Sequence, residues 1–223
     1  MNRKVIITND GTTTIQLTDK NECYHSKHGA LNEAKYVFIE KGLMHYINAN
    51  NPKKIELLEV GLGTYLNSLL TFLANKKSKI AITYTGIEAH PVEAAEIEAL
   101  NFTELLNIPK DYLLSFHRAP WNETTSFEEN FQLHKIHNRI QTNHFEKTFD
   151  IVYYDAFGHR TQPEMWDFSI FEKLYHCMNK NAVLVTYCAK GQVRRDLEKC
   201  GFEVERLAGP PGKREMLRAT KIS

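Results

Sequence analysis

The chain alternates short apolar runs with segments whose apolar residues recur about every three to four positions. The first pattern is typical of buried strands and the second of amphipathic helices. From residue 54 onward the two patterns take turns, which predicts βαβ crossovers and a mostly parallel, doubly wound sheet. The predicted strands cover residues 55–60, 80–88, 149–155, 182–187, 202–207 and 215–220, and the predicted helices cover residues 67–73, 91–106, 163–178 and 192–199.

The two ends of the chain depart from this alternation. Residues 3–17 alternate weakly around an Asn-Asp-Gly turn signal, which predicts a hairpin, and residues 29–47 carry apolar side chains at helical spacing. The last two strands follow each other without a helix, which indicates an antiparallel pair. We therefore expect an N-terminal extension of hairpin and helix over residues 1–50, packed on a core domain over residues 51–223. Residues 111–148 carry no clear pattern.

Composition is that of an ordinary soluble protein. The chain has 223 residues, 42% of them hydrophobic and 25% charged, which is enough to bury one sizeable core. Lys plus Arg (28) nearly balance Asp plus Glu (27), so a nucleic-acid site would have to be a local patch. Apolar runs stay far below the roughly 20 residues of a membrane span, and residues 5–7 are too short a run for a secretory signal. We expect a cytoplasmic protein.

The cysteines and histidines do not indicate a metal site. Cys23, Cys177, Cys188 and Cys200 never approach C-x-x-C spacing. No two histidines have the H-x-x-x-H spacing of a helical zinc site. We therefore expect no bound metal.

Residues that follow the predicted strands are candidates for a ligand site, because ligands of open parallel sheets bind at the carboxyl ends of the strands. Gly61 and Gly63 would let the backbone approach a ligand, and the absence of a third glycine at Leu66 disfavours NAD and favours a nucleoside such as S-adenosyl-L-methionine (SAM). Glu88 could accept hydrogen bonds from ribose hydroxyls, and Asp155 would face the same cleft. A plain glycine turn, a solvated Glu88 and a turn-capping Asp155 are the competing interpretations.

The C-terminal part of the chain is locally basic. Residues 190–221 hold nine Lys or Arg against five Asp or Glu, which is a net charge of +4. Arg194, Arg195, Lys213 and Arg214 could pair with nucleic-acid phosphates. A solvated helix face is the competing interpretation.

Several of these segments together resemble one known family. Residues 154–157 (Tyr-Asp-Ala-Phe) and 162–166 (Gln-Pro-Glu-Met-Trp) resemble a signature of the methyltransferase domain of the bacterial bifunctional tRNA 5-methylaminomethyl-2-thiouridine biosynthesis enzyme and its stand-alone relatives. Further matches lie at residues 29–38, 61–67, 191–195 (Gly-Gln-Val-Arg-Arg) and 213–217 (Lys-Arg-Glu-Met-Leu).

This resemblance implies a Rossmann-like class I methyltransferase fold, SAM as the donor, and methylation of the amine of 5-aminomethyluridine at the tRNA wobble position. Asp155 would lie at the methyl-transfer centre and accept the proton of the amine. The residues expected at the donor are Glu59, Gly61, Gly63, Thr64, Asn67, Glu88, Asn138 and Phe157. Those expected at the acceptor are Phe157, Pro163, Trp166, Arg194, Arg195, Lys213 and Arg214.

The chain departs from the family pattern at three points. Tyr65 replaces a usual glycine, which we expect to narrow the turn. Asn138 would meet adenine as a neutral amide in place of a carboxylate. The resemblance does not extend to the oxidoreductase domain of the bifunctional enzyme, so we expect the aminomethyl precursor to come from elsewhere.

Rival functions stay open at this point. The enzyme could methylate a different amine, since none of these residues fixes the acceptor. A non-catalytic SAM- or RNA-binding module would keep the glycine turn and the basic residues but would not need Asp155. A nicotinamide oxidoreductase fits the strand pattern but lacks the third glycine.

Overall fold

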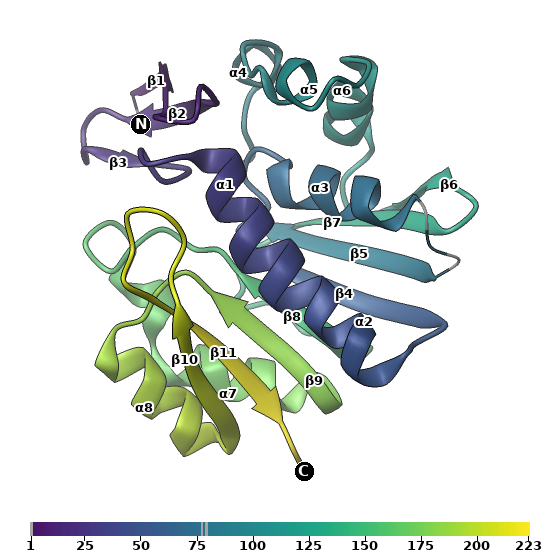
Figure 1. Ribbon diagram of the computed structural model, residues 1–223, viewed down its shortest axis with the longest axis vertical. Coiled ribbons are helices and arrows are strands. Elements are labelled where there is room, and N and C mark those ends of the chain that lie inside the picture. The colour runs from purple at the N-terminus through teal and green to yellow at the C-terminus, as the bar shows by residue number, and fades with distance from the viewer. Residues whose placement is uncertain (1, 77, 79) are drawn as a thin grey trace.

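The computed structural model describes residues 2–76, 78 and 80–223. Within these residues, one eight-stranded sheet forms the centre of the molecule, in the order β10-β11-β9-β8-β4-β5-β7-β6 (Figure 1). The strands are β4 (Lys54–Val60), β5 (Ala81–Glu88), β6 (Thr124–Glu128), β7 (Phe131–His137), β8 (Phe149–Tyr154), β9 (Met178–Thr186), β10 (Phe202–Ala208) and β11 (Glu215–Lys221).

The five central strands run parallel, and their register aligns the ends that matter for a site. Val60 at the end of β4 pairs with Ile87 of β5 on one side and with Tyr154 of β8 on the other. Glu88 in turn pairs with His137 of β7. The residues that follow these strands therefore meet at one edge of the sheet. The antiparallel β9-β11-β10 strands close one side, as the sequence predicts.

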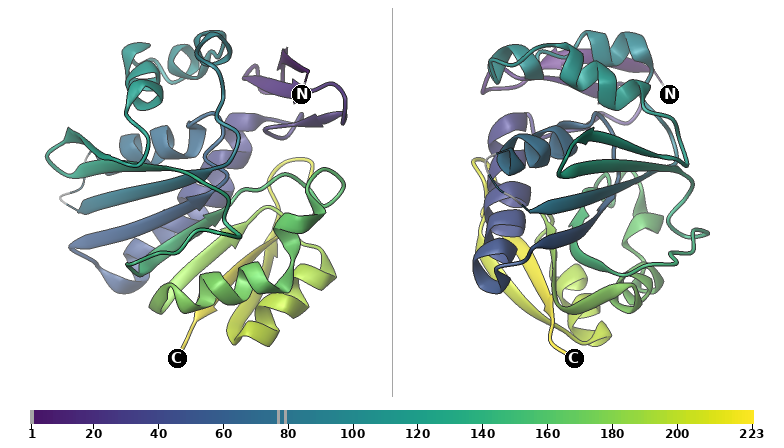
Figure 2. Two further views of the ribbon diagram at one scale, coloured as in Figure 1. Left: turned by 180° about the vertical axis from the view of Figure 1, so that it is seen from behind. Right: turned by 90° about the vertical axis from the view of Figure 1, so that its right-hand side faces the viewer.

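Helices cover both faces of the sheet (Figure 2). Ile55 and Leu57 of β4 belong to the core cluster under the first helical layer, whereas Leu58 belongs to the cluster under the second. This alternation is what a strand buried on both faces requires. The first layer contains α1 (Ala30–Ala34), η1 (Lys35–Met44), α2 (His45–Asn50), α3 (Leu66–Asn75) and α6 (Asp111–Arg118), and the second contains η2 (Pro163–Trp166), α7 (Phe168–His176) and α8 (Gly191–Cys200).

A small antiparallel sheet of β1 (Arg3–Ile7), β2 (Thr13–Leu17) and β3 (Glu22–Cys23) precedes the core. It contains the predicted hairpin, β1 paired with β2. Arg3 ties it to α4 (Ala94–Glu98) through an ion pair with Glu96 at 2.9 Å. In Figure 1 this sheet (purple) lies beside α4 and above the start of α1.

Two predicted helices are wrong in extent. The helix expected over residues 91–106 is two short ones, α4 and α5 (Phe102–Leu105), because Asn101 between them accepts a hydrogen bond from the Thr13 backbone at 2.8 Å. The helix expected over residues 163–178 is the 3₁₀ turn η2 followed by α7, and Met178 already belongs to β9, where it pairs with Phe149 of β8.

The unassigned stretch 111–148 holds a helix and two strands. One of them, β7, is a central parallel strand whose alternation is masked by Lys135, which points to the buried side and is 0% exposed. The Lys135 ammonium donates a hydrogen bond to the His117 carbonyl at 2.7 Å and lies 4.6 Å from the Trp121 ring centroid. A charged side chain thus occupies a core position at which strand alternation predicts an apolar residue. Along the described part of the chain, no helix is both long enough and apolar enough to span a bilayer.

Gly42 sets how closely η1 packs on the sheet. A Cβ there would lie 3.0 Å from Val185 and 3.1 Å from Tyr153. We expect Gly42→Val to lower the free energy of unfolding by about 1–3 kcal/mol, because overpacking displaces the helix. Chemical denaturation measures this, with the exposed Lys35→Val on the same helix as the control. Equal midpoints for the two variants would contradict the close packing.

Candidate active site

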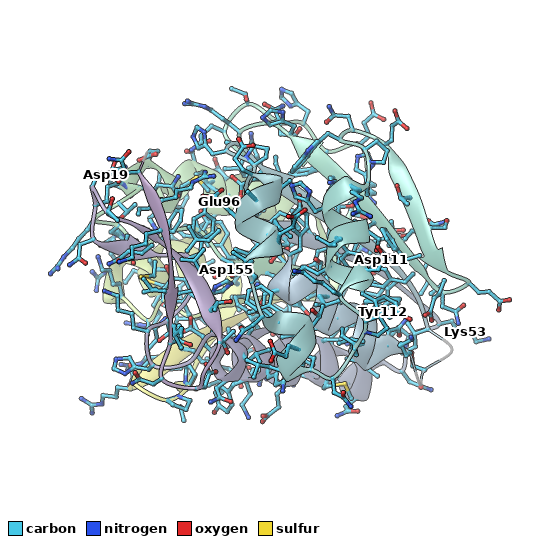
Figure 3. The ribbon with its side chains drawn as sticks, turned by 90° about the horizontal axis from the view of Figure 1, so that it is seen from above. Asp19, Lys53, Glu96, Asp111, Tyr112 and Asp155 are labelled. Carbon is cyan, nitrogen blue, oxygen red and sulfur yellow. The ribbon has the colours of Figure 1, made fainter. Side chains whose placement is uncertain are left out.

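A cavity of about 510 Å³ opens at the carboxyl edge of the sheet. Residues that follow β4, β5, β7, β8 and β9 line its floor, and the segment from Lys20 to His28 lines its upper side. The sheet register therefore brings the predicted candidates Gly61, Glu88 and Asp155 together. Seen from above, Asp155 lies inside the outline of the molecule, whereas Asp19 lies at its edge (Figure 3).

Steric contacts explain why both positions in the turn after β4 are glycine. Gly61 has φ +90°, and a Cβ there would lie 2.7 Å from the Asp155 carbonyl oxygen. Gly63 has φ +50°, and its Cβ would lie 3.2 Å from the Tyr24 ring. Both glycines therefore allow the backbone to approach neighbours that a side chain would displace.

Tyr65 does not narrow this turn, contrary to the expectation from sequence. Its backbone takes the left-handed conformation with φ +66°, so it adopts the glycine-like geometry that the turn requires. Its ring is 1% exposed and packs against His117, in the core and outside the cavity lining. The turn stays open because the large side chain points into the protein.

Glu88 holds a fixed position at the end of β5. One carboxylate oxygen accepts a hydrogen bond from the Gly63 backbone N–H at 3.1 Å, and the other accepts one from the His90 N–H at 2.8 Å. The residue also lines the cavity. A carboxylate held in this way can offer its remaining lone pairs to vicinal hydroxyls.

Asn67 bridges two acids beneath the cavity. Its amide nitrogen donates to Glu59 and to Asp155, both at 2.8 Å, and Tyr84 donates to the other oxygen of Glu59 at 2.8 Å. Burial, and then the nearby charge of Asp155, raise the pKa of Glu59 well above its ordinary value. The Asn67 Oδ1 atom is buried and finds no hydrogen-bond partner among the described residues. It therefore offers an acceptor to a ligand.

Asp155 is half-buried at the end of β8. Burial raises the pKa of its carboxyl group to about 7, and the charge of Glu33 acts in the same direction. The hydrogen bond from Asn67 and the charge of Lys213 oppose this rise. A group with this pKa exchanges its proton near neutrality, which suits an acid–base role.

The predicted aromatic residues divide into lining and support. Phe157 lines the cavity and meets the Tyr24 ring edge-on, with ring centroids 4.8 Å apart. Trp166 is buried beneath the cavity, where its indole N–H donates to the Phe157 carbonyl at 2.8 Å. Pro163 is exposed at the start of η2 and lies outside the lining.

Thr64 and Asn138 both line the cavity but already have partners. A hydrogen bond of 3.1 Å joins the Thr64 hydroxyl to His25 Nε2, and burial lowers the pKa of His25 to about 4, so this imidazole is neutral. Asn138 donates its backbone N–H to the Glu88 carbonyl at 3.2 Å, and its side-chain oxygen accepts the Arg139 N–H at 2.8 Å. It closes the loop after β7 next to Glu88.

The basic candidates lie in two different places. Arg194 pairs with Glu198 at 2.6 Å on α8, and Arg195 and Arg214 are exposed; none of the three lines the cavity. Lys213, however, lies in the cavity lining, where its ammonium pairs with Glu33 at 2.5 Å. The expected phosphate contact of Lys213 does not fit this placement, because its charge already has a partner inside the cavity.

A family of proteins described as S-adenosyl-L-methionine-dependent methyltransferases matches residues 104–222, which is more than half of the chain. The chain belongs to this family. Its cofactor is therefore SAM, and the resemblance inferred from the sequence motifs is confirmed.

Similar proteins add the relationship within the family. The chain is 31% identical over 88% of its length to the tRNA 5-methylaminomethyl-2-thiouridine biosynthesis bifunctional protein MnmC of Leptospira interrogans, and it spans 32% of that protein. It is 28% identical over 97% of its length to an uncharacterized protein of Methanocaldococcus jannaschii, of which it spans 59%. The crystal structure of MNMC2 from Aquifex aeolicus has the same fold, with a TM-score of 0.79 at 24% identity over 100% of this chain and 71% of that one.

The methyltransferase has cavity residues that the sequence did not single out. Tyr24 and His25 come from the N-terminal segment, Glu33 from α1, and Tyr187 from the loop after β9. Two of them carried a usable signal: Glu33 lies in the segment 29–38 that matches the family, and Tyr187 ends a predicted strand whose neighbours contribute to the same edge. Among the described residues, no group of three or more His, Cys, Asp or Glu is placed to hold a metal ion.

Gly63 gives a direct test of donor binding by the methyltransferase. We expect Gly63→Val to weaken SAM binding by roughly a hundredfold, because the branched side chain strains a left-handed backbone and intrudes beside Tyr24. Isothermal titration calorimetry measures this. Gly11→Val is the matched control, since Gly11 has φ +82° but nothing within 4 Å of its Cβ position. Wild-type affinity in a folded Gly63→Val protein would remove this turn from the donor site.

Proposed function

We propose that this methyltransferase methylates the primary amine of 5-aminomethyluridine, with or without 2-thiolation, at the wobble position of tRNA. The observation that carries the proposal is Asp155, a half-buried acid in the cavity whose pKa of about 7 suits the removal of a proton from an ammonium group. The name of the Leptospira relative, a tRNA 5-methylaminomethyl-2-thiouridine biosynthesis protein, supports the substrate class.

The residues of the cavity fit the donor. Gly61 and Gly63 leave open backbone where a Cβ would intrude, the orphaned Asn67 Oδ1 can accept a hydrogen bond, and Glu88 can receive ribose hydroxyls. Thr64, Asn138 and Phe157 complete that side of the lining. When bound, SAM supplies an electrophilic methyl group on a sulfonium.

Asp155 and its partners prepare the acceptor nitrogen. A primary amine is mainly an ammonium ion near neutrality and has no free lone pair. Asp155 accepts one proton and so leaves the nitrogen with a free lone pair, which would attack the methyl group that bound SAM would supply. Asn67 fixes the carboxylate for this transfer through its 2.8 Å hydrogen bond. Phe157, supported by Trp166, gives the uracil ring an aromatic wall.

The bases outside the cavity are suited to the tRNA backbone. Arg195 and Arg214 are exposed, and the ion pair of Arg194 with Glu198 is a half-exposed helical pair of the kind that contributes little to stability. Such bases raise affinity for phosphates without selecting a base sequence.

The role of Asp155 predicts a specific pH dependence. Wild-type kcat should rise as the pH passes about 7, because only the deprotonated carboxylate can accept a proton. Asp155→Asn should lower kcat by roughly 10²–10⁴-fold with little change in SAM affinity, and its residual activity should keep rising with pH as the neutral amine accumulates. Asp111→Asn, on the exposed α6 pair with Arg118, is the control (Figure 3). Parallel pH profiles for wild type and Asp155→Asn would make Asp155 structural only.

The acceptor is tested on tRNA that carries 5-aminomethyluridine and on the free nucleoside. Mass spectrometry of the digested tRNA should show a gain of one methyl group on the wobble nucleoside. Replacing Arg194, Arg195 and Arg214 together by Ala should raise the KM for tRNA several-fold and flatten its salt dependence, because phosphate contacts are lost. Activity on the free nucleoside should not change.

Three outcomes argue against parts of this proposal. Methylation of other small amines with no product on tRNA would replace the wobble uridine by a different acceptor. Equal losses on tRNA and nucleoside in the triple variant would mean that these arginines support the fold. Donor binding without any methyl transfer would indicate a binding module.

A further inference from the structure

An ammonium group of the protein itself lies in the cavity. The Lys213 Nζ atom is 2.5 Å from a Glu33 carboxylate oxygen and 3.7 Å from the centroid of the Tyr187 ring. Glu33 is only 8% exposed, so this is a desolvated pair and not a surface ion pair. The proposed mechanism assigns no task to this group of residues.

The three residues adjoin the catalytic acid. Tyr187 donates its hydroxyl to the carbonyl of Ala156 at 2.8 Å, which places its ring next to the residue that follows Asp155. Glu33, Asp155, Tyr187 and Lys213 all line the same cavity. Carboxylates and the faces of aromatic rings both bind organic cations in proteins.

Two other acids of the cavity lining, Glu59 and Glu88, already have two hydrogen-bond donors each. Glu59 accepts hydrogen bonds from Tyr84 and Asn67, and Glu88 accepts them from two backbone N–H groups. Among the described residues, the Glu33 carboxylate has no partner other than the Lys213 ammonium. An incoming cation would therefore find its carboxylate partners in Glu33 and Asp155.

Lys213 reaches this position from a loop, not from a strand or helix. It follows Gly209-Pro210-Pro211-Gly212 between β10 and β11, and its backbone N–H donates to the Pro210 carbonyl at 2.9 Å. The backbone is thus anchored, while the side chain is 28% exposed and has four rotatable bonds. The ammonium can leave the cavity without any change in the fold.

We propose that Glu33, Tyr187 and Asp155 form a subsite for the primary alkylammonium group of the acceptor, and that Lys213 occupies this subsite as an internal stand-in that the acceptor displaces. The end of a lysine side chain, a CH₂–NH₃⁺ group, is the same chemical group as the aminomethyl substituent. The inference rests on the proposed function for the identity of the acceptor. The subsite would also select a cationic acceptor. An acceptor with a hydroxymethyl group in place of the aminomethyl group would leave Glu33 buried without a counter-charge.

Binding of a simple cation tests the subsite without any need for catalysis. Methylammonium chloride, against potassium chloride at equal ionic strength, should raise the Tm of Lys213→Met more than that of the wild type, because the vacated subsite binds the added ion. The double variant Lys213→Met/Glu33→Gln should lose this extra shift. Lys35→Met, an exposed lysine on the same helical segment as Glu33, is the control and should behave as wild type. Equal shifts in all four proteins would overturn the inference.

Kinetics on the free 5-aminomethyluridine nucleoside give a second reading. Lys213→Met should lower the KM several-fold because it removes the competing ammonium. Glu33→Gln should raise the KM by roughly tenfold or more, because a buried charged partner of the acceptor is lost. Glu33→Gln replaces a buried carboxylate by a neutral amide of similar shape. The proposal can therefore still be tested if Lys213→Met does not fold. A higher KM for Lys213→Met, or an unchanged KM for Glu33→Gln, would overturn the inference.

The two readouts separate this inference from the proposed function. Methylammonium binding that requires Glu33, together with no methylation of tRNA or nucleoside, would leave the subsite in place and reject the acceptor. Methylation of tRNA with no Glu33-dependent binding of methylammonium, and with no effect of the variants on KM, would support the acceptor and reject the subsite.

Discussion

The site depends on the close approach of two strand ends. The Asp155 backbone N–H donates to the Val60 carbonyl at 3.0 Å, and its carbonyl oxygen lies where a Cβ on residue 61 would be 2.7 Å away. Strands β4 and β8 can meet in this way only because residue 61 is glycine. Asn67, in the first turn of α3, lies between Glu59 and Asp155 and donates to both. The glycine turn and Asp155 are therefore two parts of one backbone contact.

Two acidic side chains, Glu59 and Asp155, lie close together under the cavity. Their hydrogen-bond partners limit the free-energy cost of their mutual repulsion. Two ionised carboxylates joined by one amide would repel each other in a poorly solvated site, and burial raises the pKa of both Glu59 and Asp155. Tyr84 and Asn67 satisfy Glu59 deep in the core, which leaves the titration near neutrality to Asp155, at the cavity surface. The sulfonium of SAM and the ammonium group of the proposed acceptor would balance the negative charge of such a site.

Most of the fold could be predicted from the sequence, and so could the meeting of Gly61, Glu88 and Asp155 at one cavity, because the signals for both are local. Apolar runs, the glycine turn and the residues after the strands are each read within a few positions. The errors arose where tertiary contacts overrule local pattern: Lys135 hides a central strand, and a hydrogen bond between Thr13 and Asn101 divides a helix. Lys213 has the sequence context of a surface base, and only the packing of its loop against α1 places it in the cavity.

The two ends of the cavity consequently differ in how far apart in the sequence their residues lie. Residues 61–64, 66 and 67 line the end of the cavity that we propose binds the donor, and they come from one turn and the first residues of α3. The opposite side combines Glu33 of α1, Tyr187 after β9 and Lys213 of the β10–β11 loop, which are far apart in the sequence. The same loop also packs on the N-terminal segment, since a Cβ at Gly212 would lie 2.4 Å from His28. Changes in how α1 and this loop pack would thus alter the end of the cavity proposed for the acceptor and leave the glycine turn, proposed for the donor, in place.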